Sequence, residues 1–261
     1  MNLKKCSVCW EYIEKEFPFP LLDGENGVAS KIVRVLCKCE RKEADEREKK
    51  WEYEQKMVRI STLKNMSLMD NQLKKVTFDD IIVNEYNNNQ VKICKRYTNK
   101  FNEMKRNKQG LILYGDVGTG KTYLSACIAN KLLEEQKPVI MTSFAKLLNN
   151  VRDYQSQKDI MEKISNVSLV IMDDFGIERS SDYAFERMYE VVNTVYDFGI
   201  PLIITTNIDI KDMTSCKDIK LKRLYDRILE RCYPVKFTGF SWRKNEAGRR
   251  YSEMKKILEE E

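Results

Sequence analysis

The feature that most constrains the fold is the run LILYGDVGTGKTYL at residues 111–124, which contains the pattern G-x-x-x-x-G-K-[ST]. An apolar strand precedes the glycines and a helical segment follows them. Glycines let the backbone turn tightly, so that several N–H groups point at phosphates, and the helix N-terminus adds positive potential. This context argues against a chance glycine-rich turn. The residues expected to bind ATP or ADP are Gly115, Asp116, Val117, Gly118, Thr119, Gly120, Lys121, Thr122 and Tyr123.

Apolar runs alternate with longer helical segments from about residue 77 onward, which predicts an α/β fold. The runs are nearly continuous, as in a parallel sheet covered by helices on both faces. We therefore predict a five-stranded parallel sheet flanked by helices. The expected strands are 111–115, 138–143, 169–174, 201–207 and 235–239, and the expected helices are 121–135, 144–154, 182–197, 217–231 and 245–260.

Two of these strands end in polar side chains. Asp173 and Asp174 close the run LVIMDD, and Asn207 closes PLIITTN. Ligands bind at the carboxyl ends of strands in open α/β sheets, so we expect Lys121 and Thr122 to meet these groups there. Lys121 would reach the β- and γ-phosphates, while Thr122 and Asp173 would hold hydrated Mg²⁺. Asp174 would orient and deprotonate water. The alternatives are a helix N-cap for the aspartates and a plain turn for the asparagine.

Arginines recur on the segment KDIKLKRLYDRILERC. Arg223, Arg227 and Arg231 lie four residues apart, and therefore on one helix face, while Arg243 follows in FSWRKN. Residues 217–250 contain eleven Lys or Arg against four Asp or Glu. The positive surplus of this segment is larger than the net charge of the whole chain, which is +6. Guanidinium groups stabilise charge on a transferring phosphoryl group. A solvated basic face is the alternative.

Four cysteines fall in the first 39 residues as two pairs, Cys6-x-x-Cys9 and Cys37-x-Cys39. Four soft ligands in two local pairs favour tetrahedral Zn²⁺ in a structural site. The chain has no histidine, so any other ligand would be a carboxylate. Unliganded thiols, a redox pair and an iron–sulfur cluster are the alternatives.

The segment 40–66 is rich in both charge signs and free of Gly and Pro, which predicts a solvated helix. Its second half becomes amphipathic, with Trp51 and Val58 beside the apolar stripe. We expect a cysteine module at 1–39, this helix and a hinge at 40–76, and an ATPase domain at 77–261. The chain has neither a signal sequence at its start nor an apolar run long enough to span a membrane, so we expect no membrane association and a cytoplasmic location.

The motifs between about Thr77 and Tyr251 resemble, in order, those of the bacterial and phage DnaC/DnaI-type helicase loaders of the AAA+ class. These are VTFDDIIV, GDVGTGKT, LVIMDDFGIE, IITTN, LYDRILERC and SWR. The resemblance implies that Lys121 and Thr122 belong to Walker A. It likewise implies a Walker B pair, Asp173 and Asp174, with Asn207 as sensor 1. Arg227 looks like the arginine finger, with Arg223 as runner-up, and Arg243 looks like sensor 2.

Two departures from the wider AAA+ pattern affect what we expect. Walker B ends in Asp-Asp instead of Asp-Glu, and the shorter Asp174 side chain predicts slow hydrolysis, suited to a switch. The chain also ends soon after Arg243, which leaves no room for the helical lid domain of most AAA+ proteins.

The resemblance implies an ATP-dependent loader that places a hexameric DnaB-type replicative helicase on single-stranded DNA during DNA replication and self-associates through AAA+ interfaces. The N-terminal region would grip the helicase, unless the stripe near Trp51 packs on the chain's own ATPase domain. Three residues of the segment 141–166 are candidates for contacting the single-stranded DNA: Phe144, Lys146 and Arg152. The alternatives are an IstB-type transposition helper ATPase, whose N-terminal region usually differs, and a helicase-regulating adaptor that does not hydrolyse ATP.

Overall fold

The computed structural model describes residues 3–20, 28–150, 154–176 and 182–259. The chain divides into two compact units, Met1–Val58 and Arg59–Glu261. The division falls within one continuous helix, α1 (Lys38–Met66), which includes the predicted solvated helix. No helix in the described part of the chain is both long and apolar enough to cross a membrane.

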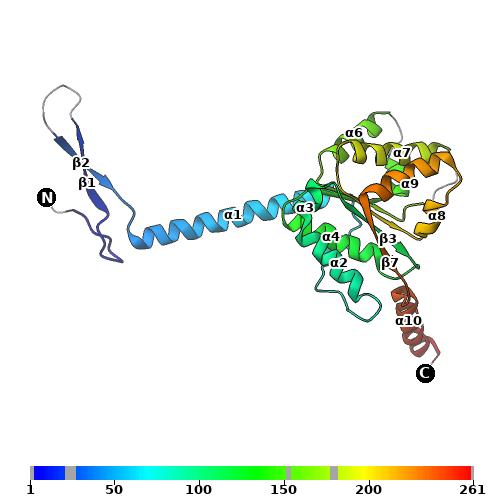
Figure 1. Cartoon of the computed structure of the whole chain (residues 1–261). Coiled ribbons are helices and arrows are strands. Elements are labelled where there is room, and N and C mark those ends of the chain that lie inside the picture. Colours follow the sequence, from blue (N-terminus) through cyan, green and yellow to red (C-terminus); the bar gives the residue numbers. More distant parts are fainter. Residues whose placement is uncertain (1–2, 21–27, 151–153, 177–181, 260–261) are drawn as a thin grey trace. The chain divides into compact units, whose positions relative to one another are not determined.

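The N-terminal unit contains an antiparallel hairpin that we did not predict from the sequence. Strand β1 (Glu14–Pro20) pairs with β2 (Val28–Arg34), with Glu14 opposite Arg34. An isolated bridge between Lys5 and Tyr12 closes the loop that carries the first cysteine pair. Because its strands are antiparallel, the hairpin places the loop before β1 next to the start of α1, which follows β2 (Figure 1).

The second unit is built on a parallel sheet with strand order β4-β5-β6-β3-β7, which confirms the predicted five-stranded parallel sheet. The strands are β3 (Gly110–Gly115), β4 (Val139–Ser143), β5 (Leu169–Asp173), β6 (Leu202–Thr206) and β7 (Cys232–Phe237). Strand β7 begins three residues earlier than predicted. It is an edge strand, where Pro234 is tolerated because one side of its backbone needs no partner.

Helices cover both faces of this sheet (Figure 1). The helices that follow α1 are α2 (Asn88–Asn99), α3 (Phe101–Arg106), α4 (Lys121–Glu134), α5 (Phe144–Asn150), α6 (Tyr154–Ser165), α7 (Asp182–Asp197), α8 (Ile210–Thr214), α9 (Ile219–Arg231) and α10 (Trp242–Glu259), with a 3-10 turn at Leu73–Lys75. Helix α10 buries none of its residues and extends away from the sheet (Figure 1). The sequence did not predict α2, α3 or α8. Of the helix predicted at 144–154, the structure describes α5 up to Asn150 and the first residue of α6, Tyr154, and residues 151–153 lie outside the described part of the chain.

The two faces of the sheet form two apolar cores. Leu111 and Leu113 of β3 pack in the core that includes α2 and α4, whereas Ile112 packs in the core that includes α5, α6, α7 and α9. Side chains alternate between faces along a strand, so a continuous apolar run supplies both cores. The sheet is therefore rigid, and its carboxyl edge is a fixed platform for polar groups.

Candidate functional site

The loop between β3 and α4 has a backbone that only glycine allows at its key points. Gly115, Gly118 and Gly120 have φ values of 121°, 81° and 98°, in the left-handed region. A Cβ atom on Gly115 would lie 2.1 Å from the carbonyl oxygen of Phe237 in β7, and one on Gly118 would lie 2.4 Å from Ser241 Oγ. The glycines of the motif therefore permit both the turn and close packing against neighbouring backbone.

Lys121 begins α4 and is buried inside the loop. Its Nζ donates to the carbonyl oxygens of Gly115 (2.8 Å) and Asp116 (2.6 Å), and to Asn207 Oδ1 (2.9 Å). Burial lowers the pKa of the ammonium, although nearby carboxylates, first Asp174, act in the opposite direction. Three oxygen acceptors thus hold the lysine where the motif places a phosphate-binding group.

Thr122 and Asp173 meet directly. Thr122 Oγ1 donates to Asp173 Oδ1 at 2.8 Å, and Thr205 Oγ1 of β6 donates to the same oxygen at 2.5 Å. Burial raises the pKa of the Asp173 carboxyl above its ordinary value, although both hydroxyl donors oppose this. A hydroxyl and a carboxylate at one point are hard oxygen ligands suited to Mg²⁺.

Asp174 has a φ of 53°, a left-handed backbone that aspartate tolerates better than most residues. Its N–H donates to Thr205 Oγ1 at 2.9 Å, and the next N–H, of Phe175, donates to the Thr205 carbonyl at 2.8 Å. Asp173 and Asp174 therefore end β5 in a turn tied to β6. This geometry disfavours the helix N-cap alternative.

Asn207 follows the last residue of β6 and accepts the hydrogen bond from Lys121 described above. Strand β6 lies between β5 and β3 in the sheet. The sheet order thus brings together the side chains of Lys121, Thr122, Asp173 and Asn207, as the sequence predicted from the carboxyl ends of three strands.

Arg243 reaches the same region from the start of α10. The backbone N–H of Trp242 donates to the carbonyl oxygen of Gly118 at 2.9 Å, so the first turn of α10 lies on the phosphate loop. Arg243 is close enough that its charge contributes to lowering the pKa of Lys121. Arg243 thus lies beside the phosphate loop, and its role as sensor 2 stays a prediction.

The arginines of α9 lie elsewhere. The Arg227 guanidinium is 5.5 Å from the ring centre of Tyr189 and 5.2 Å from that of Tyr196, both on α7. Arg231 lies 3.5 Å from the Tyr196 ring centre, and Arg223 is exposed. In the described residues, the contacts of Arg227 are with α7 and not with the phosphate loop. A finger that completes the site of a neighbouring subunit stays a prediction.

An apolar pocket beside the loop was not identified from the sequence. It has a volume of about 260 Å³, and Ile81, Ile82, Tyr123 and Trp242 contribute to its walls. Tyr123 was predicted as a nucleotide contact, but the others were not. A planar base is the part of a nucleotide that prefers apolar walls. The signal was present in the apolar pair of VTFDDIIV and in the Trp that precedes Arg243.

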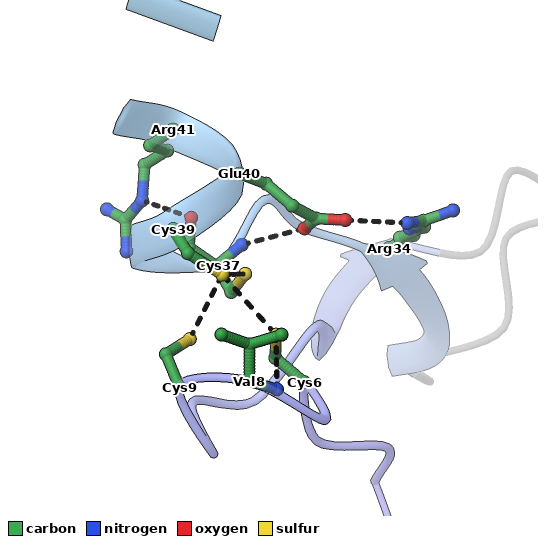
Figure 2. Close-up of polar contacts among 8 residues, drawn as sticks. All are labelled: Cys6, Val8, Cys9, Arg34, Cys37, Cys39, Glu40 and Arg41. Atoms are coloured by element: carbon green, nitrogen blue, oxygen red, sulfur yellow. Dashed lines mark hydrogen bonds and ion pairs between the residues drawn. The ribbon is translucent and has the colours of Figure 1, made fainter. Parts of the chain in front are cut away.

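The four N-terminal sulfur atoms form one cluster. All of them lie within 4.8 Å of one another. Cys39 Sγ is 3.5 Å from Cys6 Sγ, 3.1 Å from Cys37 Sγ and 3.6 Å from Cys9 Sγ, as Figure 2 shows. Four thiolates about 2.3 Å from one tetrahedral ion would be roughly 3.8 Å apart. The cluster therefore has the dimensions of a closed four-sulfur metal site.

Backbone N–H groups and one carboxylate lie next to the two cysteine pairs of the cluster. The N–H of Glu11 is the main cause that lowers the pKa of Cys9 to about 6, and backbone N–H groups, chiefly that of Cys9, also lower the pKa of Cys6. Burial raises the pKa of Cys37. Glu40 accepts from the Cys37 N–H at 3.1 Å and from Arg34 at 2.8 Å (Figure 2). Amide donors to sulfur and a carboxylate that orients the second pair are typical outer partners of a metal site.

The proposed protein and DNA contacts have mixed outcomes. Trp51 and Val58 are both 62% exposed on α1. Phe144 is 1% exposed within the core on one sheet face, so our expectation that it contacts a DNA strand is wrong, because a buried ring cannot stack on a base. Lys146 is exposed and forms an ion pair with Asp70. Arg152 lies outside the described residues.

Comparisons with known proteins agree with the resemblance seen in the motifs. The sequence profile of the family described as IstB-like ATP binding protein matches residues 40–249. The replicative helicase loader DnaC of Escherichia coli strain K12 is 27% identical over 164 residues, which is 60% of this chain and 64% of that protein. The replicative helicase loader DnaI of Bacillus subtilis strain 168 is 26% identical over 159 residues, 55% of this chain and 50% of that protein.

A solved structure gives a likeness of fold. The crystal structure of DnaI aligns with a TM-score of 0.56 at 23% identity, over 66% of this chain and 93% of that chain. At this identity the likeness speaks for the fold alone. This chain spans 64% and 50% of the lengths of the two curated relatives above.

The buried Asp173 generates a pH-dependent prediction. Its folded-state pKa is raised, so its contribution to stability is full below the unfolded pKa and is lost as the pH rises through the folded pKa. We expect nucleotide-free Asp173→Asn to melt above the wild type at pH 7, and this difference to vanish near pH 4. The variant should lose most of the stabilisation that Mg²⁺ and ATP give the wild type. Thermal unfolding followed by fluorescence measures both effects.

The matched control is Asp79→Asn, a change at an exposed carboxylate, which should alter stability by no more than about 0.5 kcal/mol at either pH. An Asp173→Asn protein that melts below the wild type at pH 7 would contradict the assignment of a costly buried charge.

Proposed function

The chain belongs to the family of IstB-like ATP binding proteins, and from this premise we propose that it is an ATP-dependent loader of a DnaB-type hexameric replicative helicase. The helicase would be delivered to single-stranded DNA. One observation carries the proposal: Lys121 contacts Asn207, and Thr122 contacts Asp173, at the ends of neighbouring strands, which supports one nucleotide site there. Two curated relatives named replicative helicase loaders support it.

The site residues divide the chemistry of ATP among them. Lys121 would exchange its carbonyl and amide acceptors for the β- and γ-phosphates, and Asn207 would then hydrogen-bond the γ-phosphate or the attacking water. Thr122 and Asp173 would hold Mg²⁺, which neutralises charge on the phosphates. Asp174 would orient and deprotonate the water, at a slow rate because its side chain is short. Arg243 would stabilise phosphate charge within the same chain.

Three segments of the chain would have separate roles in the loader. We assign residues 1–39 to a zinc module, 40–76 to the arm that grips the helicase, and 77–261 to the ATPase domain. Exposed Trp51 and Val58 give the arm apolar contacts for partner helices. The four sulfur atoms of the N-terminal region lie close enough together to bind one metal ion. Such a module favours a loader over an IstB-type transposition helper, because the N-terminal region of those helpers usually differs.

Mixing the full chain with a DnaB-type helicase, zinc and ATP tests the function. We expect a defined complex by size-exclusion chromatography and light scattering. Lys121→Ala should abolish ATP binding and the effect of ATP on the complex, because no other ammonium replaces Nζ at the loop. If the wild-type protein forms no complex with the helicase but binds duplex DNA together with a transposase, the result would favour the function of an IstB-type transposition helper. A complex without phosphate release, with or without single-stranded DNA, would favour the adaptor.

Arg227 provides a test of self-association. Arg227→Ala should keep ATP binding but lose the hydrolysis that rises with protein concentration, since the neighbour's site would lack its finger. Phosphate release measured over a range of protein concentrations tests this. The expected loss of stability is small, about 0.5–1 kcal/mol for each tyrosine contact, so the variant should fold.

Arg223→Ala is the matched control, on the same helix and exposed. An unchanged, DNA-stimulated rate in Arg227→Ala would refute the finger assignment. If Arg223→Ala alone loses activity, the role belongs to that residue.

The cysteine cluster predicts one bound zinc ion for each chain. Cys37→Ser should lose the metal and the structure of the N-terminal unit, because a segment of this size depends on ligation for most of its folding energy. It should also lose the helicase complex but keep ATP binding in the other unit. Elemental analysis, circular dichroism and ATP titration measure the three effects.

Cys216→Ser, a change at a cysteine outside the cluster, should keep the zinc. Visible absorbance with iron in the wild type would identify an iron–sulfur cluster instead, and a metal-free protein that still binds the helicase would refute a structural role.

A further inference from the structure

A groove lies at the end of the sheet opposite the nucleotide site. Its walls come from α2 and α9 and from the first residues of β3 and β7, and its volume is about 720 Å³. The phosphate loop follows the last residue of β3, Gly115, whereas the groove includes the first, Gly110. At about 3.3 Å per residue, the two places are roughly 17 Å apart along the strand. The groove is therefore distinct from the ATP site.

One wall of the groove is a basic stripe. Lys92 and Arg96 lie four residues apart on one face of α2, and Lys100 directly follows the last residue of that helix. All three line the groove and are exposed. Lys100 has a long ion pair with Glu103 at 3.8 Å. For Lys92 and Arg96 no carboxylate lies within ion-pair distance in the described parts of the chain. The surrounding segment 92–108 carries seven Lys or Arg and a single acidic residue.

An exposed aromatic ring also lines the groove. Tyr233 lies on the edge strand β7 and is 63% exposed. The partly buried side chains of Ile93, Met104 and Leu229 contribute apolar surface between the walls. The groove thus offers a ring and an apolar floor beside a row of positive charges.

Two other charged residues line the groove. The Glu230 carboxylate accepts from the Tyr196 hydroxyl at 3.0 Å. Arg231 donates to the Tyr196 carbonyl oxygen at 2.7 Å and stacks on its ring. These partners are neutral, so both residues keep their charges, and the lining holds four Lys or Arg against one Glu and is positive on balance.

The two walls are fixed to each other before any ligand binds. Gln90 Nε2 of α2 donates to the carbonyl oxygen of Lys236 in β7 at 2.7 Å. Tyr97, one turn from the stripe, is buried, and its hydroxyl donates to the Gln109 carbonyl oxygen at 3.0 Å. A groove with preset walls loses little conformational entropy on binding.

We infer that this groove binds one strand of nucleic acid, with phosphates along Lys92, Arg96 and Lys100 and a base stacked on Tyr233. A positive groove with an exposed ring is the combination that binds single strands. A duplex encloses the faces of its bases in its own stack, so it could use the charges but not the ring. The inference adds a strand contact to the proposed function, but it depends on neither ATP hydrolysis nor helicase binding.

Fluorescence anisotropy with a labelled oligothymidylate and the full, zinc-loaded chain with ATP tests the groove over a series of salt concentrations. The triple variant Lys92→Gln, Arg96→Gln, Lys100→Gln should bind more weakly. Its slope of log K against log salt should be smaller by about 2, since each phosphate contact on a single strand contributes about 0.7. The matched control Lys131→Gln, Lys217→Gln, Lys255→Gln removes three exposed charges outside the groove and should keep the wild-type slope.

The aromatic wall has a different signature. Tyr233→Leu should weaken strand binding about tenfold or more without changing the salt slope, because stacking releases no counterions. Tyr233→Phe should retain the wild-type affinity. A strand carrying 5-iodouracil should form a photo-crosslink to the peptide that contains Tyr233.

The outcomes separate the groove from the proposed function. An unchanged salt slope in the triple variant overturns the groove, and so does a wild-type protein that binds no strand. Equal affinity for a duplex of the same length, with the same loss in the variants, overturns the assignment to a single strand. Helicase complex formation and ATP binding are measured on the same proteins. Their failure in the wild type refutes the loader, whereas their persistence in groove variants isolates the strand contact.

Discussion

The nucleotide site depends on the contacts that Lys121 and Thr122 make across the edge of the sheet. The lysine reaches Asn207, and the threonine reaches Asp173. Both residues begin α4, whereas their partners end β6 and β5, so the contacts require β3, β5 and β6 to lie side by side in the order β5-β6-β3. The two apolar cores hold these strands, because side chains from each strand enter both faces. Burial on two faces thus fixes four polar side chains at one edge.

The same contacts make the site costly without its ligands. Lys121 is buried with a lowered pKa, Asp173 is buried with a raised pKa, and the Asp174 backbone has a positive φ. Burial disfavours the charged form of both side chains, and an anion beside the lysine or a cation beside the aspartate would offset this cost. Half of the N-terminal cluster behaves alike: burial raises the pKa of Cys37, and hydrogen bonding to the Cys37 thiol raises that of Cys39, so a cation bound between the sulfur atoms would favour their ionised forms.

Much of this structure could be predicted from apolar runs and motif spacing. Strands such as Leu169–Asp173 are short, apolar and ended by polar residues, and these signals are local. Helices α2 and α3 escaped prediction because polar and charged residues make up most of their sequence and their apolar stripe is carried by few residues, among them Val91 and Tyr97. The burial of Phe144 depends on which face of α5 meets the sheet, and spacing within the helix does not determine this. The base-sized pocket unites Ile82 with Trp242, and proximity of that kind arises only in the folded chain.

The hydrogen bond from Trp242 to Gly118 makes α10 a lever whose pivot is the phosphate loop itself. The helix has 18 residues, so it is about 27 Å long at 1.5 Å per residue. A shift of the Gly118 peptide would therefore act directly on the first turn of this helix. Exposed apolar side chains lie in the middle of α10, at Tyr251, and near its far end, at Ile257 and Leu258, so such a shift would also displace an apolar surface.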